Sequence, residues 1–125
     1  MTFRFARHTN NLEQLKSFYT SILGLEVLGS FENHDSYDGI FLGKANENWH
    51  LEFTQSKEIV SFNFGEEDCL VFYPNTKVAF ELILQNLKEN AIEIIEAKNP
   101  YWNENGKLFL DPDGYRIVIS NLKIK

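Results

Sequence analysis

The sequence predicts an α+β fold in which two tandem βαβββ modules form a curved mixed sheet around a central cup. Three observations support this prediction. Short runs that alternate polar and apolar residues, as half-buried strands do, recur along the chain. Two amphipathic segments with helical spacing each follow the first such run of a module. The same order of elements also occurs twice, because Cys69 lies 65 positions after Arg4 and Arg116 lies 66 positions after His50.

The first module is predicted over about residues 1–56. Its first strand, FRFARH, covers residues 3–8. A helix follows, for which Asn11 is a good N-cap and Gly24 stands at the expected left-handed end. The helix has an apolar stripe made of Leu12, Leu15, Phe18, Tyr19 and Ile22. Three strands are expected next: LEVLGSF from Leu25, YDGIFLG from Tyr37 and NWHLEFTQ from Asn48.

The second module is predicted over about residues 68–125, after a polar linker at 57–67. It opens with the strand CLVFY, and Asn75 or Thr76 then caps a helix. Asn90 holds the ending position that Gly24 holds in the first module. Three more strands are expected: IEIIEA, KLFLD and YRIVIS. We expect the two modules to pack as one domain over residues 1–125.

Composition excludes several classes of function. The chain has 125 residues, of which 43% are hydrophobic and 14% aromatic, so it can bury a core. Its net charge of −6 repels polyanions, which argues against nucleic acid and anionic membranes as partners. No apolar run resembles a signal segment or a membrane helix, so we expect a soluble cytoplasmic protein. A lone cysteine, Cys69, fits a reducing compartment.

Strand parity places a set of polar side chains on one face of the sheet. In WHLEFT the apolar residues should face the helix, which leaves His50, Glu52 and Thr54 on the opposite face. The same parity adds these positions from the other first and last strands: Arg4, Ala6, His8, Cys69, Val71, Tyr73, Arg116, Val118 and Ser120. Such a face would line a cavity for a small organic ligand, although a buried ion pair with satisfied neighbours would give the same pattern.

Two motifs resemble a known superfamily. FYTSILGLEV (18–27) and DPDGYRIVI (111–119), together with the duplicated module, resemble the vicinal oxygen chelate superfamily, which includes glyoxalase I, bleomycin-resistance proteins and extradiol dioxygenases. The resemblance covers nearly the whole chain. It implies the glyoxalase/bleomycin-resistance fold, and in the superfamily's enzymes it implies a divalent metal held by the first and last strands of each module.

The metal positions implied by the resemblance fall on Arg4, Glu52, Cys69 (or Asp68) and Val118. Arginine stays protonated and valine has no donor atom, so we predict no cofactor at this set. We expect the guanidinium of Arg4 to pair with Glu52 instead. A rearranged site that binds Zn, Ni, Mn or Fe through His8, His50, Glu52 and Cys69 remains an alternative, because these side chains are all metal ligands.

The first functional prediction is therefore a glyoxalase/bleomycin-resistance-like protein that has lost the metal site and binds a small molecule. Its predicted ligand contacts are Arg4, His8, His50, Glu52, Thr54, Tyr73, Tyr101, Trp102 and Arg116. Tyr101 and Trp102 lie in NPYWNENG, which is a predicted loop. Their rings would stack on a flat ligand, close over the mouth of the cup or pack across a dimer interface. A metal-dependent lyase, isomerase or dioxygenase and metal-free acid–base catalysis by Glu52 or His50 are the alternatives. We expect a homodimer.

Overall fold

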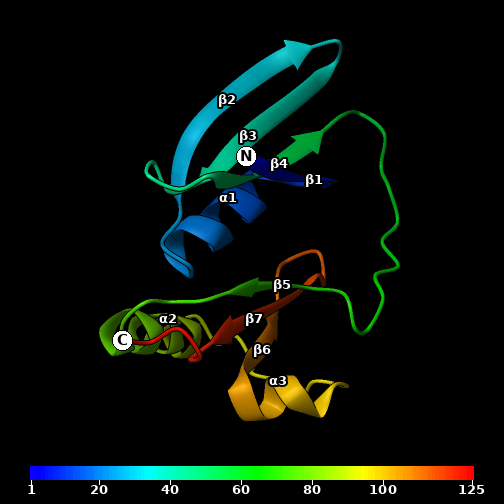
Figure 1. Ribbon diagram of the computed structural model, residues 1–125. Helices are drawn as coiled ribbons and strands as arrows, with labels where there is room; N and C mark the ends of the chain where they lie inside the picture. The colour runs from blue at the N-terminus through cyan, green and yellow to red at the C-terminus, as the bar shows by residue number, and fades with distance from the viewer. The chain divides into compact units, whose positions relative to one another are not determined.

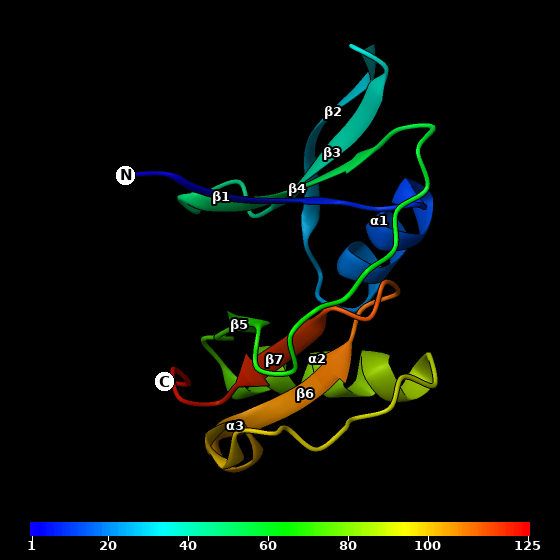
Figure 2. The same cartoon turned by 90° about the vertical axis from the view of Figure 1, so that its right-hand side faces the viewer.

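The computed structural model describes residues 1–125 and divides into two compact units, Met1–Ser61 and Phe62–Lys125 (Figures 1 and 2). Residues 56–68, between the last strand of the first unit and the first strand of the second, contain no helix or strand. Each unit is described by itself. The predicted single domain, with modules 1–56 and 68–125, stays a prediction. None of the helices is long and apolar enough to cross a membrane.

Unit 1 contains the complete predicted module. Its elements are β1 (Phe3–His8), α1 (Leu12–Ser21), β2 (Glu26–His34), β3 (Tyr37–Gly43) and β4 (Trp49–Gln55). The sheet has the order β1-β4-β3-β2, in which β1 and β4 are parallel and the other neighbours are antiparallel. The first and last strands of the module are therefore direct neighbours, although they are far apart in the sequence.

Helix α1 covers one face of this sheet (Figure 1). Its N-cap is Asn11, as predicted, because the Asn11 side chain accepts a hydrogen bond from the Gln14 backbone N–H at 3.1 Å. Gly24 follows the helix with a φ of 71°, which confirms its left-handed role. The rings of Tyr19 and Phe53 pack 4.9 Å apart, and both side chains are fully buried. The predicted parity of β4 is confirmed, because Phe53 faces the helix.

The β2–β3 hairpin contains the strand that the sequence predicts from Tyr37, because β3 has the same bounds. Gly39 lies inside β3, as that prediction requires. The turn itself is formed by Asp35 and Ser36, whose φ angles of 52° and 71° suit a two-residue hairpin turn. The aromatic ring of Phe31 in β2 covers Gly39, in the space where a Cβ atom would be. Gly39 is thus needed for packing across the strands.

Unit 2 has the elements β5 (Cys69–Phe72), α2 (Lys77–Glu89), α3 (Pro100–Asn105), β6 (Gly106–Leu110) and β7 (Arg116–Ser120). Its sheet has the order β5-β7-β6, and β5 and β7 are again parallel (Figure 2). Thr76 is the N-cap of α2 and accepts a hydrogen bond from the Ala79 N–H at 3.1 Å. Asn90 is the C-cap of α2, so the helix ends where the sequence predicts, but the left-handed conformation falls on the next residue, Ala91, with a φ of 54°.

Two predictions for unit 2 were wrong. The segment IEIIEA is not a strand, and only Ile95 forms an isolated bridge, to Leu108. The segment NPYWNENG is not a loop but contains α3, which begins with Asn99 as N-cap and a proline in its first turn. The side chain of Asn103 in α3 explains why the segment around Ala97 is not a strand. This side chain bonds both the N–H and the carbonyl of Ala97, at 2.7 and 2.9 Å, so these backbone groups need no strand partner.

This arrangement covers the sheet face of unit 2 that the sequence assigned to a cavity. Val118 is fully buried in a cluster with Ala97 and Leu108, and Trp102 packs against the cluster. Ser120 is also fully buried and donates a hydrogen bond to the Asn105 carbonyl at 2.7 Å. The expectation that Val118 and Ser120 line an open cavity is therefore wrong, because the segment that ends in α3 fills the space above them.

Candidate functional site

The candidate site lies on the face of the unit 1 sheet that points away from α1. The parallel pairing of β1 with β4 sets Arg4 opposite His50, Ala6 opposite Glu52 and His8 opposite Thr54. Side chains paired in this way point to the same side of the sheet. The structure therefore brings together the polar residues that strand parity predicts for the first module.

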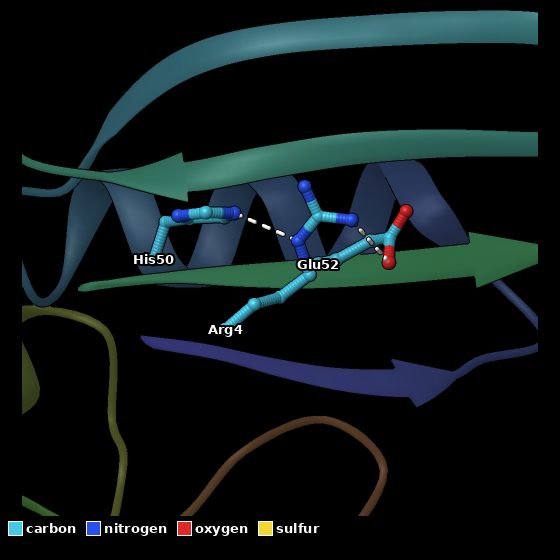
Figure 3. Close-up of polar contacts among 3 residues, drawn as sticks. All are labelled: Arg4, His50 and Glu52. Atoms are coloured by element: carbon cyan, nitrogen blue, oxygen red, sulfur yellow. Dashed lines mark hydrogen bonds and ion pairs between the residues drawn. The ribbon is translucent and has the colours of Figure 1, made fainter. Parts of the chain in front are cut away.

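Arg4 is the centre of this group (Figure 3). Its Nε–H donates a hydrogen bond to His50 Nε2 at 2.8 Å, and its Nη1 donates to Glu52 Oε1 at 3.5 Å. The second contact is also an ion pair, which confirms the expected pairing of Arg4 with Glu52. The guanidinium carbon lies 4.8 Å from the centre of the Phe41 ring, a cation–π distance. Three contacts thus hold one guanidinium group in place.

These contacts fix the chemical state of His50. An arginine Nε–H can only donate, so His50 Nε2 must carry a lone pair and the imidazole proton belongs on Nδ1. The two charged side chains also differ in burial. The Arg4 side chain is 49% exposed, whereas the Glu52 side chain is only 15% exposed. Glu52 is therefore the inner group, and Arg4 covers it and presents positive charge to the solvent.

A small open pocket adjoins Arg4. Its volume is about 210 Å³, and it is lined by Arg4, Leu28, Phe41 and His50. Gly43, the strand partner of His50, leaves room here, since a Cβ atom on it would lie 3.1 Å from Leu28 Cδ1 and 3.3 Å from His50 Cβ. The pocket combines a cation and an imidazole with two apolar walls.

His8 and Thr54 form a second polar pair farther along the same strands. His8 Nδ1 and Thr54 Oγ1 are 3.1 Å apart and share a hydrogen bond. The ring of Tyr37 meets the His8 ring edge to face, with centroids 6.0 Å apart. These two predicted ligand residues are on the same face as Arg4 but do not line its pocket.

The predicted site residues of unit 2 have partners within that unit. Arg116 donates a hydrogen bond from Nη1 to the Gly65 carbonyl at 3.1 Å. Tyr73 is 40% exposed, and the Lys123 ammonium group lies 5.7 Å from the centre of its ring. Tyr101 is half exposed and meets the Trp102 ring edge to face at 4.9 Å. Trp102 faces the Val118 cluster, so it has a packing role in its own unit.

Cys69 is the first residue of β5 and packs against the same apolar cluster. Burial raises the pKa of its thiol above the ordinary value of 9.0, and the negative charge of Asp68 raises it further. Arg116, its partner in the β5–β7 pairing, lowers the pKa in part. The thiol is therefore the favoured form at neutral pH, which is poor for both metal binding and nucleophilic attack.

Comparison with known proteins places the chain in a family. Two family profiles match it: the YycE-like N-terminal domain over residues 3–54 and the YycE-like C-terminal domain over residues 67–121. The chain is also 38% identical over 121 residues to the uncharacterized protein YycE of Bacillus subtilis (strain 168), and the alignment covers 96% of this chain and 87% of that protein. The chain belongs to the YycE-like family.

Solved structures show that this YycE-like chain has the glyoxalase/bleomycin-resistance fold, as the sequence predicts. The crystal structure of B. subtilis YycE, a protein of unknown function, matches with a TM-score of 0.84 and 36% identity, covering 96% of this chain and 88% of that one. Trypanothione-dependent glyoxalase I of Leishmania major has the same fold, with a TM-score of 0.77, 20% identity and coverage of 98% and 87%. A variant of the fosfomycin resistance protein FosX of Listeria monocytogenes, solved with Mn(II) and a dihydroxypropylphosphonic acid, matches at 0.69 and 11% identity, with coverage of 96% and 92%.

The residues of this YycE-like chain do not fit the metal that the superfamily's enzymes hold. No group of three or more His, Cys, Asp or Glu side chains is arranged to bind a metal ion. At the first implied position, the guanidinium of Arg4 has no lone pair and bonds the two donors beside it, His50 and Glu52. At the fourth, Val118 is a buried hydrocarbon. The coordination set that the resemblance implies is therefore not present at these positions.

The sequence did not single out two residues of the YycE-like site, Leu28 and Phe41. Strand parity could have predicted that Phe41 lies on the site face, because β3 pairs with β4 and sets Phe41 opposite Glu52. Leu28 has no such signal. The β2–β3 register shifts between Val27 and Gly29, and this irregularity places Leu28 beside the pocket.

Proposed function

We propose that this YycE-like protein binds a small organic molecule at the β1–β4 face of unit 1, and that Arg4 there takes the place of a metal ion. One observation supports the proposal above all. The Arg4 guanidinium lies between His50 Nε2 and Glu52 Oε1, bonded to both, which is where a cation shared by these two groups would lie. A fixed positive charge neutralises Glu52 without a bound ion.

The adjoining pocket supports binding as the role of this face. It has apolar walls, Leu28 and Phe41, and two polar groups with unused bonding capacity, which is the usual mixture in small-molecule sites. The fold also accommodates small molecules, because the FosX variant was solved with a phosphonic acid. His8 and Thr54, on the same face, would extend the contact to a longer ligand.

The experiment is a small-molecule screen read by the backbone amide spectrum of the isotope-labelled protein, carried out with EDTA present. We expect hits that shift the amides of β1, β4 and Phe41, and we expect Arg4→Met to lose them while Lys77→Met, an exposed change in unit 2, keeps them. Hits that appear only after Zn, Ni, Mn or Fe is added, and that Glu52→Gln abolishes, would replace this proposal with a metal-dependent lyase, isomerase or dioxygenase. A complete lack of shifts on this face would reject both.

We also propose that residues 1–125 unfold as a single domain and that two chains form a homodimer. A single unfolding transition, coincident by circular dichroism and tryptophan fluorescence, checks the first statement. Light scattering should give a mass of twice 14.6 kDa. Two separate transitions, or a monomer mass at micromolar concentration, would contradict these statements.

A further inference from the structure

The bonding of Arg4 leaves one side of its guanidinium unused. A guanidinium has five N–H donors, and Arg4 uses its Nε–H for His50 and one Nη1–H for Glu52. Figure 3 shows that the remaining terminal nitrogen carries no bond to either residue. One N–H of Nη1 and both of Nη2 are therefore available as donors. Two parallel N–H groups at the end of a guanidinium match the two oxygens of a carboxylate.

The guanidinium is also held in a fixed orientation before any ligand arrives. Two hydrogen bonds and the Phe41 ring, 4.8 Å from the guanidinium carbon, restrict a side chain that is otherwise long and flexible. A ligand that binds here does not have to order it, which reduces the entropy cost of binding.

The charge at the pocket favours an anion despite the nearby carboxylate. Glu52 is only 15% exposed and does not line the pocket, whereas Arg4 is 49% exposed and does. His50 bonds Arg4 through Nε2, so its Nδ1–H is a second donor and no acceptor on the imidazole remains. The polar groups that line the pocket therefore offer donors alone.

The other walls and the size of the pocket define the rest of the ligand. Leu28 and the Phe41 ring are apolar, so the body of the ligand should be apolar, and a flat ring would suit Phe41. The volume of about 210 Å³ is below the roughly 300–1,000 Å³ of sites for drug-sized ligands. A single ring with one acidic group is of the right scale.

From these observations we infer that the ligand class is a small apolar or aromatic carboxylic acid, whose carboxylate binds the free side of Arg4 and whose body lies against Leu28 and Phe41. This inference rests on the proposed function and names the chemistry of that same site.

Three probes of nearly equal shape test the charge requirement: benzoate, benzyl alcohol and benzylamine. Each is titrated into the labelled protein with EDTA present, and the dissociation constant is read from the amide shifts of β1, β4 and Phe41. We expect benzoate to bind at least about tenfold more tightly than benzyl alcohol, because a charge-assisted bidentate contact exceeds a neutral hydrogen bond by about this much. Benzylamine should bind most weakly.

Variants test whether Arg4 causes the preference. Arg4→Met should remove the advantage of benzoate over benzyl alcohol, and Arg4→Lys, which keeps the charge but not the paired donors, should retain only part of it. Phe41→Leu should weaken benzoate and benzyl alcohol by similar factors, whereas Lys77→Met should change neither. Thermal melts identify any variant that does not fold, and Arg4→Lys then serves in place of Arg4→Met.

The outcomes separate this inference from the proposed function. If benzyl alcohol or benzylamine shifts the same amides as strongly as benzoate, the acid class is wrong and small-molecule binding at this face stands. If benzoate binds but its shifts lie outside β1, β4 and Phe41, or survive Arg4→Met unchanged, the assignment to Arg4 is wrong. If none of the probes and no library compound shifts this face, both proposals fail.

Discussion

The ion pair between Arg4 and Glu52 can be tested by a double-mutant cycle. The variants are Arg4→Met, Glu52→Gln and the combination of both. If the guanidinium neutralises Glu52, then removing Arg4 alone leaves a largely buried carboxylate without its partner and His50 Nε2 without its donor. Neutralising Glu52 as well should recover part of the lost stability.

The expected coupling energy between Arg4 and Glu52 follows from the burial of the two side chains and the distance between them. The Nη1–Oε1 distance is 3.5 Å, and the two side chains are 49% and 15% exposed, so the pair is intermediate between surface pairs, at about 0.2–1 kcal/mol, and buried ones. We expect Arg4→Met to cost about 2 kcal/mol, because it leaves polar groups unsatisfied, and Glu52→Gln to cost about 1 kcal/mol. The double variant should lose about 1.5 kcal/mol, less than Arg4→Met alone, which corresponds to a coupling of about 1.5 kcal/mol.

The assay is urea unfolding followed by circular dichroism at low salt and at 1 M NaCl, where screening should reduce part of the coupling. A matched control is the pair Lys77–Glu81, which is separated by 3.9 Å and is 77% and 60% exposed. Its cycle should give no more than about 0.5 kcal/mol. A coupling between Arg4 and Glu52 as small as that of the control pair would refute the role assigned to the guanidinium.

Three further predictions concern packing and the thiol. Gly39→Ala should destabilise by about 1 kcal/mol, because a Cβ atom would meet the Phe31 ring, and the double variant with Phe31→Ala should lose less than the sum of the single losses; additive losses would show that the ring does not depend on the glycine. Asn103→Ala should cost about 1–3 kcal/mol in urea unfolding and shift the fluorescence of the neighbouring Trp102 to the red, since Ala97 loses both side-chain bonds; an unchanged midpoint would contradict this account. For Cys69, the raised pKa means that the folded state holds the thiol proton more tightly than the unfolded state. The stability it contributes is present below pH 9.0 and is lost as pH rises through the folded pKa, so the wild type should lose stability above pH 9.0 more steeply than Cys69→Ala. Iodoacetamide should also react slowly with Cys69 at pH 8, and rapid modification would contradict the prediction.

The sequence predicted unit 1 well because its signals are local. Alternation in WHLEFT fixes which side chains face the helix, and a single side chain, Asn11, specifies where α1 begins. The pairing of Arg4 with Glu52 could be predicted from parity together with the superfamily resemblance. Neither step needs knowledge of distant packing.

Unit 2 shows what such signals miss. The segment 92–97 alternates like a strand, but its backbone groups at Ala97 bond to the side chain of Asn103. That interaction depends on α3, and the residues of α3 were taken for a loop because Asn99 and Pro100 are also typical of turns. Once the helix was missed, Trp102 could not be placed in its apolar cluster.

The pocket beside Arg4 was missed in part for a related reason. Parity correctly selects the face, but the register shift between Val27 and Gly29 that brings Leu28 to the pocket has no signature in a single sequence.

The central claim, that Arg4 replaces a metal ion beside Glu52, is tested most directly by metal stoichiometry. The purified wild-type protein and Glu52→Gln are each dialysed against Zn, Ni, Mn and Fe, and the bound metal is measured by mass spectrometry. We expect the two proteins to retain the same small amounts, well below one ion per chain, because the guanidinium already bonds His50 and Glu52. One equivalent of metal in the wild type that Glu52→Gln loses would contradict the claim.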